Sequence, residues 1–179
     1  LDSSELTISY TLRENEKYNI YFGQMHSHTS YSDGAGTAAE AYQHGKTVEN
    51  LDFLSVTDHS NSFDNAESAS ILDGSVSEEW KEGHQLEETY TSEDFVGIFG
   101  YEMTWSNGLG HNTFNSNGFQ SRTQTEFATY STALQNYYAA LKSVPGSISQ
   151  FNHPGTTFGD FSDFAHYDET IDNLITLIE

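Results

Sequence analysis

The chain has 179 residues, no cysteine and a formal charge of -21, from 27 acidic and 6 basic residues. This length can bury a sizeable core, whereas the acidic balance argues against a nucleic-acid backbone or an anionic membrane surface as partner. Without cysteine there is no disulfide framework and no thiolate chemistry, and no apolar run approaches the ~20 residues that a membrane span needs.

The composition also bears on location and domain organisation. Lysine is scarce while Ser, Thr, Asn, Gly and Tyr are abundant, which favours an extracytoplasmic bacterial protein, with a cytoplasmic location left open. Residues 1–19 alternate only weakly and predict an edge strand or a segment leading into the domain. The pattern of a folded core starts after them, so we expect one domain over residues 20–179.

Short apolar runs alternate with amphipathic stretches along this domain. The periodicity predicts helices over residues 36–50, 77–90 and 126–142. It predicts strands over residues 20–22, 51–56, 95–102, 111–115, 147–153 and 174–179. Strands and helices in this order favour a sheet whose strand ends carry the functional residues.

Ligand-type side chains follow these predicted strands. His26 and His28 are two residues apart, so on a strand they point to the same side. Imidazole and carboxylate suit divalent ions such as Zn, Mn or Fe. The set is too large for one four-coordinate ion and predicts two or three, which could clamp both oxygens of a displacement. The candidate ligands are His26, His28, Asp33, His59, Glu102, His111 and His153.

Two further residues receive supporting roles. Asp58 directly precedes His59, and we expect its carboxylate to orient a ligand imidazole or a loop amide rather than to bind an ion itself. Arg122 is one of two arginines and lies beyond the predicted metal loops, where it could hold a substrate phosphate through two hydrogen bonds. A surface ion pair is the alternative for Arg122.

Taken together, these motifs resemble a known family, the PHP (polymerase and histidinol phosphatase) domain of metal hydrolases. The pairing of Glu102 with a later Gly-His is most similar to the carbaryl-hydrolase-like branch of that family. The resemblance runs from about residue 20 to the end of the chain. The motifs that carry it are His26-Ser27-His28, Ser32-Asp33-Gly34, Thr57-Asp58-His59, Glu102, Gly110-His111 and Asn152-His153-Pro154.

The resemblance implies an α/β fold, a distorted (β/α)7 TIM-like barrel with metals at the C-terminal strand ends. Here we expect it to be incomplete at the C-terminus, because no Asp-x-His follows His153. By motif position, the resemblance implies that His26, His28 and Glu102 hold one metal. Glu102 would also bridge this metal to a second metal. His111 and His153 would hold that second metal, and Asp33 and His59 a third.

The implied activity is that of a metal-dependent phosphoesterase acting on a small phosphorylated molecule. A metal-bridging hydroxide would be the nucleophile, and no separate protein base is assigned. Two alternatives stay open: hydrolysis of a carbamate, amide or carboxylic ester, and a catalytically idle metal-binding module. A further expected partner is the missing C-terminal part of the same polypeptide.

Overall fold

A computed structural model describes residues 18–125, 129–166 and 168–179. The strands are β1 (Gly23–Gln24), β2 (Phe53–Val56), β3 (Val96–Thr104), β4 (Gly110–Phe114), β5 (Ile148–Asn152) and β6 (Ile175–Ile178). The helices are α1 (Ala38–Thr47), α2 (Glu78–Tyr90), α3 (Arg122–Thr125), α4 (Tyr130–Leu141), α5 (Phe161–Phe164) and α6 (Glu169–Asp172), with 3-10 turns η1 (Ser60–Ser62) and η2 (Ala66–Ser68). Among the described helices, none has both the length and the apolar character needed to cross a membrane.

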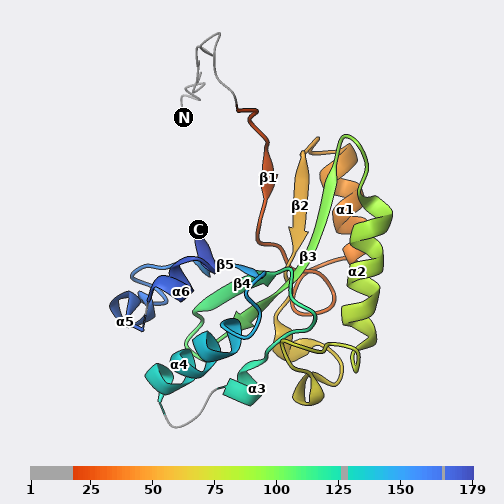
Figure 1. The fold of residues 1–179 in the computed structure, drawn as a ribbon. Helices are drawn as coiled ribbons and strands as arrows, with labels where there is room; N and C mark the ends of the chain where they lie inside the picture. The colour runs from red at the N-terminus through yellow and green to blue at the C-terminus, as the bar shows by residue number, and fades with distance from the viewer. Residues whose placement is uncertain (1–17, 126–128, 167) are drawn as a thin grey trace, which may run out of the picture.

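The strands form one six-stranded mixed sheet in which spatial order follows chain order, β1-β2-β3-β4-β5-β6. The β1–β2, β2–β3 and β5–β6 pairs are parallel, whereas β4 runs antiparallel to both β3 and β5. Figure 1 shows α1 and α2 beside β2 and β3, and α4 beside β4. The expected (β/α)7 barrel is therefore wrong for this chain.

The reason for the difference lies in the connection between β3 and β4. Only residues 105–109 separate the two strands, and a parallel crossover needs a dozen residues or more. The chain therefore turns back, and β4 pairs antiparallel to β3. In the part of the chain that the structure describes, β1 and β6 lie at the two ends of the strand order and the sheet stays open.

Several predicted elements are confirmed in position, with shifted bounds. Helix α2 begins after Ser77, whose side chain accepts from the backbone N–H of Trp80 and caps the helix. The predicted strand at residues 20–22 is wrong: these residues are exposed, and β1 begins only at Gly23. Residues 1–17 and 126–128 of the predicted lead-in segment and helix lie outside the described residues.

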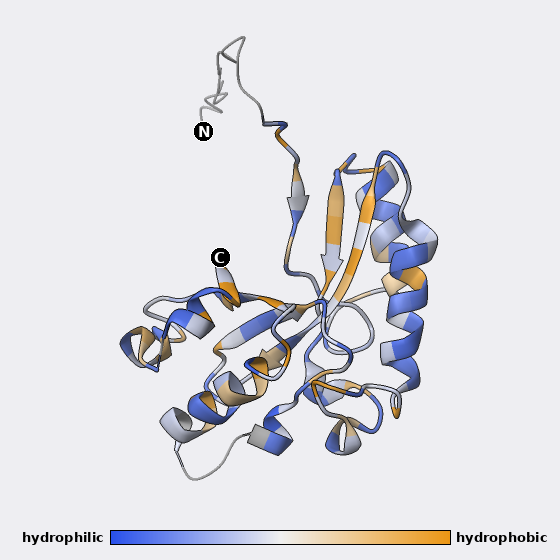
Figure 2. Ribbon diagram, viewed as in Figure 1, coloured by the Kyte–Doolittle hydropathy of each residue, from blue (hydrophilic) through white to orange (hydrophobic). Residues whose placement is uncertain are grey.

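The two faces of the sheet differ because alternate residues of a strand point to opposite sides. Phe99 and Tyr101 of β3 face the helices: the Phe99 ring packs against Gly83 of α2, and Tyr137 of α4 donates to the Tyr101 hydroxyl (3.3 Å). Glu102, one residue further along, points to the other face. We call the helix-covered side the outer face and the opposite side the inner face. Figure 2 shows apolar residues along β2 and β3 and mostly hydrophilic ones on α2.

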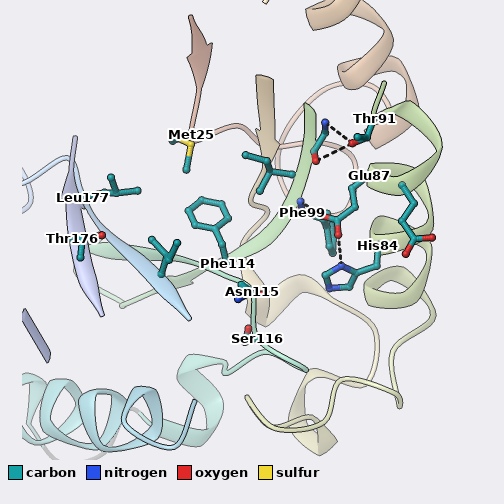
Figure 3. Close-up of a pocket in the computed structure, with 14 residues that line it drawn as sticks. Met25, His84, Glu87, Thr91, Phe99, Phe114, Asn115, Ser116, Thr176 and Leu177 are labelled. Atoms are coloured by element: carbon teal, nitrogen blue, oxygen red, sulfur yellow. Dashed lines mark hydrogen bonds and ion pairs between the residues drawn. The ribbon is translucent and has the colours of Figure 1, made fainter. Parts of the chain in front are cut away.

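An open cavity lies along β3, before β4 joins that strand. A cavity of about 880 Å³ is lined by apolar side chains that include Met25, Phe114 and Leu177 (Figure 3). On the far side of this cavity, Glu87 and Thr91 of α2 accept hydrogen bonds from the backbone N–H groups of Phe99 and Gly97, as Figure 3 shows. These side chains satisfy the edge of β3 before β4 joins it at Gly100.

Candidate metal centre

His26 and His28 lie just beyond β1, where parallel pairing with the next strand continues. The N–H of Thr57 donates to the carbonyl of Ser27 (2.8 Å), and the hydroxyl of Ser27 donates to the carbonyl of Ser55 (2.5 Å). With Ser27 held in this way, the flanking imidazoles point to the same side, and their Nε2 atoms are 3.1 Å apart. The predicted convergence of these two histidines is what the geometry shows.

The buried carboxylate of Asp58 holds the loop after His28 through hydrogen bonds. Asp58 is fully buried and accepts hydrogen bonds from the Thr29 N–H (2.7 Å), the Thr29 hydroxyl (2.8 Å) and the Ser32 hydroxyl (2.6 Å). The loop folds tightly enough that a Cβ at Gly34 would lie 2.2 Å from the carbonyl oxygen of His28. Asp58 therefore lies where a loop-orienting residue was expected.

Asp33 sits on this loop and faces two histidines. Its Oδ1 atom is 2.8 Å from Nδ1 of His28, and its Oδ2 atom is 3.6 Å from Nε2 of His59. The pKa of Asp33 is lowered, first by its hydrogen bond with His28. The side chain itself is exposed, so this carboxylate closes the solvent side of the group.

Glu102 lies at the centre, with a different pair of imidazoles on each oxygen. Its side chain is 1% exposed. Oε1 is 3.6 Å from Nε2 of His26 and 3.5 Å from Nε2 of His153. Oε2 is 3.3 Å from Nε2 of His28 and 2.6 Å from Nδ1 of His59. One carboxylate therefore joins two clusters of nitrogen donors.

The electrostatics of this centre follow from a buried negative charge among imidazoles. Burial alone would raise the pKa of Glu102, but hydrogen bonds with His153, His28 and His59 outweigh it and hold that pKa well below its usual range. Burial also opposes charge on His28, yet Glu102 and Asp33 raise the pKa of His28 to about 9. The hydrogen bond with Glu102 likewise raises the pKa of His153. The site therefore attracts positive charge, which protons or metal ions can supply.

His153 reaches the centre from the end of β5 through an unusual backbone conformation. Its φ is +36°, a region that few residues other than glycine occupy. The turn brings the ring within 5.6 Å (centroid to centroid) of His26, and the Phe158 ring packs on it at 4.8 Å. Strained backbone of this kind is more frequent at functional sites.

Glu179 belongs to the same centre, although the sequence pattern did not single it out. Its Oε2 atom is 3.1 Å from Nδ1 of His26 and accepts a hydrogen bond from the His153 N–H (3.0 Å). The signal that could have found it is the one that found Glu102, namely a carboxylate directly after an apolar strand. The sequence pattern predicts only the end of a strand at this position.

His111 does not join this centre. In the β3–β4 register it pairs with Met103, so its side chain lies on the outer face, while Asn112 pairs with Glu102 on the inner face. The His111 ring is fully buried against Tyr138 and Phe161. Burial lowers its pKa to about 3, so it is neutral at pH 7. The resemblance had placed His111 beside His153 on one metal, and the structure does not bring these two rings together there.

The position of Arg122 follows from the short helix α3. It opens α3 and is half-buried, and α3 packs against η1, the turn that directly follows His59. The other cations in the described chain serve elsewhere. Lys81 pairs with a glutamate of its own helix, Lys142 with Asp168, and Lys46 donates to Ser92.

The donor atoms fit divalent metal ions in kind and in spacing. Two ligands at ~2.0–2.1 Å from a tetrahedral zinc ion lie roughly 3.3 Å apart, close to the 3.1 Å between Nε2 of His26 and His28 and the 3.3 Å from His28 to Glu102. Among the described residues, three groups have ligand atoms within 4.8 Å of one another: His26, His28 and Glu102; His26, His153 and Glu179; His28, Asp33 and His59. Imidazole nitrogen with carboxylate oxygen is a donor set for first-row divalent ions.

Comparisons with known proteins include a partial structural likeness. No family model and no curated protein matches the sequence. The chain is similar to a crystal structure of a two-domain protein from Bacteroides vulgatus ATCC 8482, which contains a predicted PHP-like metal-dependent phosphoesterase. The TM-score is 0.45 and the identity 19%, over 75% of this chain and 35% of that chain. The chain thus spans about a third of that protein, and the chemistry of the site has to come from its own donor atoms.

Proposed function

We propose that the chain is a metal-dependent hydrolase of the PHP type that cleaves a phosphoester in a small molecule. One observation carries the proposal: the buried Glu102 carboxylate directs one oxygen to His26 and His153 and the other to His28 and His59. A carboxylate placed in this way can bridge two ions. We further propose that two or three ions of Zn, Mn or Fe bind, through the histidines and carboxylates named above.

The ions and the protein would divide the work. Divalent ions held there would acidify a water molecule and neutralise charge on the ester oxygens. His26, His28, His59 and His153 would supply neutral nitrogen donors, and Glu102 would set the separation of the two clusters. Asp58 would hold the loop that carries Asp33. Arg122 remains a proposed contact to the substrate phosphate.

A second candidate reaction has its own support. Three of the four Lys and Arg side chains in the described ranges are engaged away from the centre, so cationic side chains for a doubly charged phosphate are scarce. A carbamate, amide or carboxylic ester needs no such clamp, and this chemistry would agree with the carbaryl-hydrolase-like branch.

The two reactions are separated by a panel of 4-nitrophenyl substrates: the phosphate monoester, the bis-phosphodiester, the acetate and a carbamate. With Mn²⁺, Zn²⁺ or Fe²⁺ added, we expect the highest kcat/KM on a phosphoester, and its loss in His28→Ala. The control is Glu82→Gln, which alters a carboxylate that bonds Tyr31 outside the centre. Hydrolysis that survives in His28→Ala would place the reaction elsewhere, and turnover of the carbamate alone would select the second candidate.

A further inference from the structure

Glu102 is held by two side-chain donors in addition to its histidine contacts. The Thr104 hydroxyl donates to Oε2 (2.7 Å), and the Asn152 amide donates to Oε1 (2.8 Å). All three side chains are buried. Each oxygen thus accepts a hydrogen bond from a neutral donor of the sheet, and Oε1 keeps its second acceptor position on the side of His26 and His153.

The orientation of the Asn152 amide is fixed by its neighbours. Its Oδ1 atom faces the backbone N–H of Asn112 (3.3 Å) and Nε2 of Gln150 (3.1 Å), and a backbone N–H can only donate. The Nδ2 group must therefore be the side that faces Glu102. The same Nδ2 also donates to Oδ1 of Asn112 (2.9 Å).

The amide network continues to the segment after β1 that carries the first histidines. Nδ2 of Asn112 donates to the carbonyl of Met25 (3.0 Å), the residue before His26. A chain of hydrogen bonds, partly buried at Met25 and buried beyond it, therefore runs from Met25 through Asn112 and Asn152 to Oε1 of Glu102. It ties the position of His26 to that of the carboxylate oxygen that faces it.

Thr104 acts on the other oxygen and on another histidine. Its hydroxyl lies 2.5 Å from Nδ1 of His59, and Oε2 of Glu102 lies 2.6 Å from the same nitrogen. Because the hydroxyl hydrogen is given to Glu102, the remaining hydrogen in this triangle belongs to Nδ1 of His59. Nε2 of His59, which faces Asp33, is then the nitrogen that a neutral ring would offer to an ion.

We propose that Asn152 and Thr104 are positioning residues for the metal centre, one for each oxygen of Glu102. Asn152 would set the ion on the side of His26, His153 and Glu179, and Thr104 the ion on the side of His28, Asp33 and His59. This inference rests on the proposed metal binding and adds to it that the two ions can be weakened separately. Residues that orient ligands typically change metal affinity by about 10–100-fold.

The test is a titration of the metal-free chain with Co²⁺. Binding is measured by calorimetry and by the visible absorption of the bound ion. The variants are Thr104→Val, which keeps the shape and removes the hydroxyl, and Asn152→Asp, which keeps the acceptor and removes the donor. Asn152→Ala is included because Asn152→Asp also adds charge. The matched control is Thr113→Val, since Thr113 is a buried hydroxyl of the same sheet on the outer face.

We expect each variant to weaken one Co²⁺ site by about 10–100-fold and to leave the other site unchanged. Thr104→Ser should restore affinity, and Thr113→Val should bind Co²⁺ as the parent does. In a His153→Ala background, Thr104→Val should still weaken the remaining ion, whereas both Asn152 variants should add no further loss. Thermal unfolding in EDTA, measured for every variant, shows whether the metal-free fold is retained.

The proposal is overturned if folded Thr104 and Asn152 variants bind Co²⁺ as the parent does, if both weaken the two sites equally, or if Thr113→Val loses the same affinity. A parent chain that binds no Co²⁺ at all would contradict the proposed function itself. A parent that binds Co²⁺ and hydrolyses esters, with unaffected variants, would contradict this inference alone.

Discussion

The two faces of β3, β4 and β5 show how differently neighbouring residues of one strand can serve. On the inner face, Glu102 and Asn112 meet in a buried polar network beside four imidazoles. On the outer face, Met103 and His111 are buried, and the His111 ring packs against Tyr138 and Phe161. A shift of one residue along a strand exchanges these environments, so chemistry depends on register as much as on residue type.

The histidines His111 and His153 make this contrast measurable. His111 lies near the start of β4 and His153 directly follows β5. The sequence predicts both as metal ligands. His153 meets the Glu102 carboxylate, which raises its pKa, whereas desolvation lowers the pKa of His111 to about 3. In addition, Nδ1 of His111 has no hydrogen-bond partner among the described residues. One ring lies in a site that attracts cations and the other in a core that excludes them.

Glu102→Gln should have the largest effect, because it removes the negative charge that distinguishes the inner face from the outer face. The amide keeps the shape but cannot balance the surrounding positive charge or bridge two ions, so we expect metal affinity to fall by more than about 100-fold. Elemental analysis after dialysis against Co²⁺ measures this, with Glu82→Gln as the control. Retention of the full metal content by Glu102→Gln would show that the histidines bind ions without the carboxylate.

A smaller effect on the inner face is expected from Gly110→Ala. A Cβ at this position would lie 2.1 Å from Oε1 of Glu102, so the carboxylate must shift from its place beside His26 and His153. We expect Co²⁺ affinity to fall by about 10-fold or more. Gly146→Ala serves as the control, because its Cβ would have no neighbour nearer than 3.8 Å. Equal affinities in the two variants would mean that the position of Oε1 is unimportant.

On the outer face, His111→Phe should leave metal binding intact and change the pH dependence of stability. The His111 pKa is about 3 in the folded chain and ~6.5 in an unfolded one. Between these values the unfolded state binds the extra proton, so stability falls as the pH falls, by up to about 1.4 kcal/mol per pH unit. Urea unfolding in EDTA at pH 5 to 7 should show a shallower loss for His111→Phe than for the parent. A parallel pair of curves would contradict the buried neutral ring.

The smallest expected signal concerns protons released by the inner face. In the metal-free chain the pKa of His28 is raised to about 9, so this ring is protonated at pH 7 and must lose its proton to bind an ion. Metal affinity should therefore rise between pH 6 and pH 9. Calorimetry in buffers of different ionisation enthalpy should show proton release at pH 7. Binding without release would place the ions away from His28.

Several parts of the fold and site could be predicted from the sequence because they depend on local patterns. The i, i+2 spacing of His26 and His28 placed both rings on one side, and Ser77 marked the start of α2. The sheet topology could not be predicted from the sequence, because the antiparallel return of β4 depends on the short loop after Thr104. The face of the sheet to which His111 points could not be predicted either. Periodicity shows that side chains alternate between two faces, but not which face the helices cover. Glu179 was missed because its contacts join residues 26 and 153 to the far end of the printed sequence.

The most direct test of the account compares the metal content of three chains: the parent, His111→Phe and His153→Ala. Each is loaded with Co²⁺, dialysed and measured by elemental analysis. The account predicts about two or more bound ions in the parent and in His111→Phe, as in two-metal hydrolytic sites. It predicts a loss of metal in His153→Ala. Equal losses in the two variants, or a parent chain without bound metal, would contradict the assignment of the metal centre to the inner face.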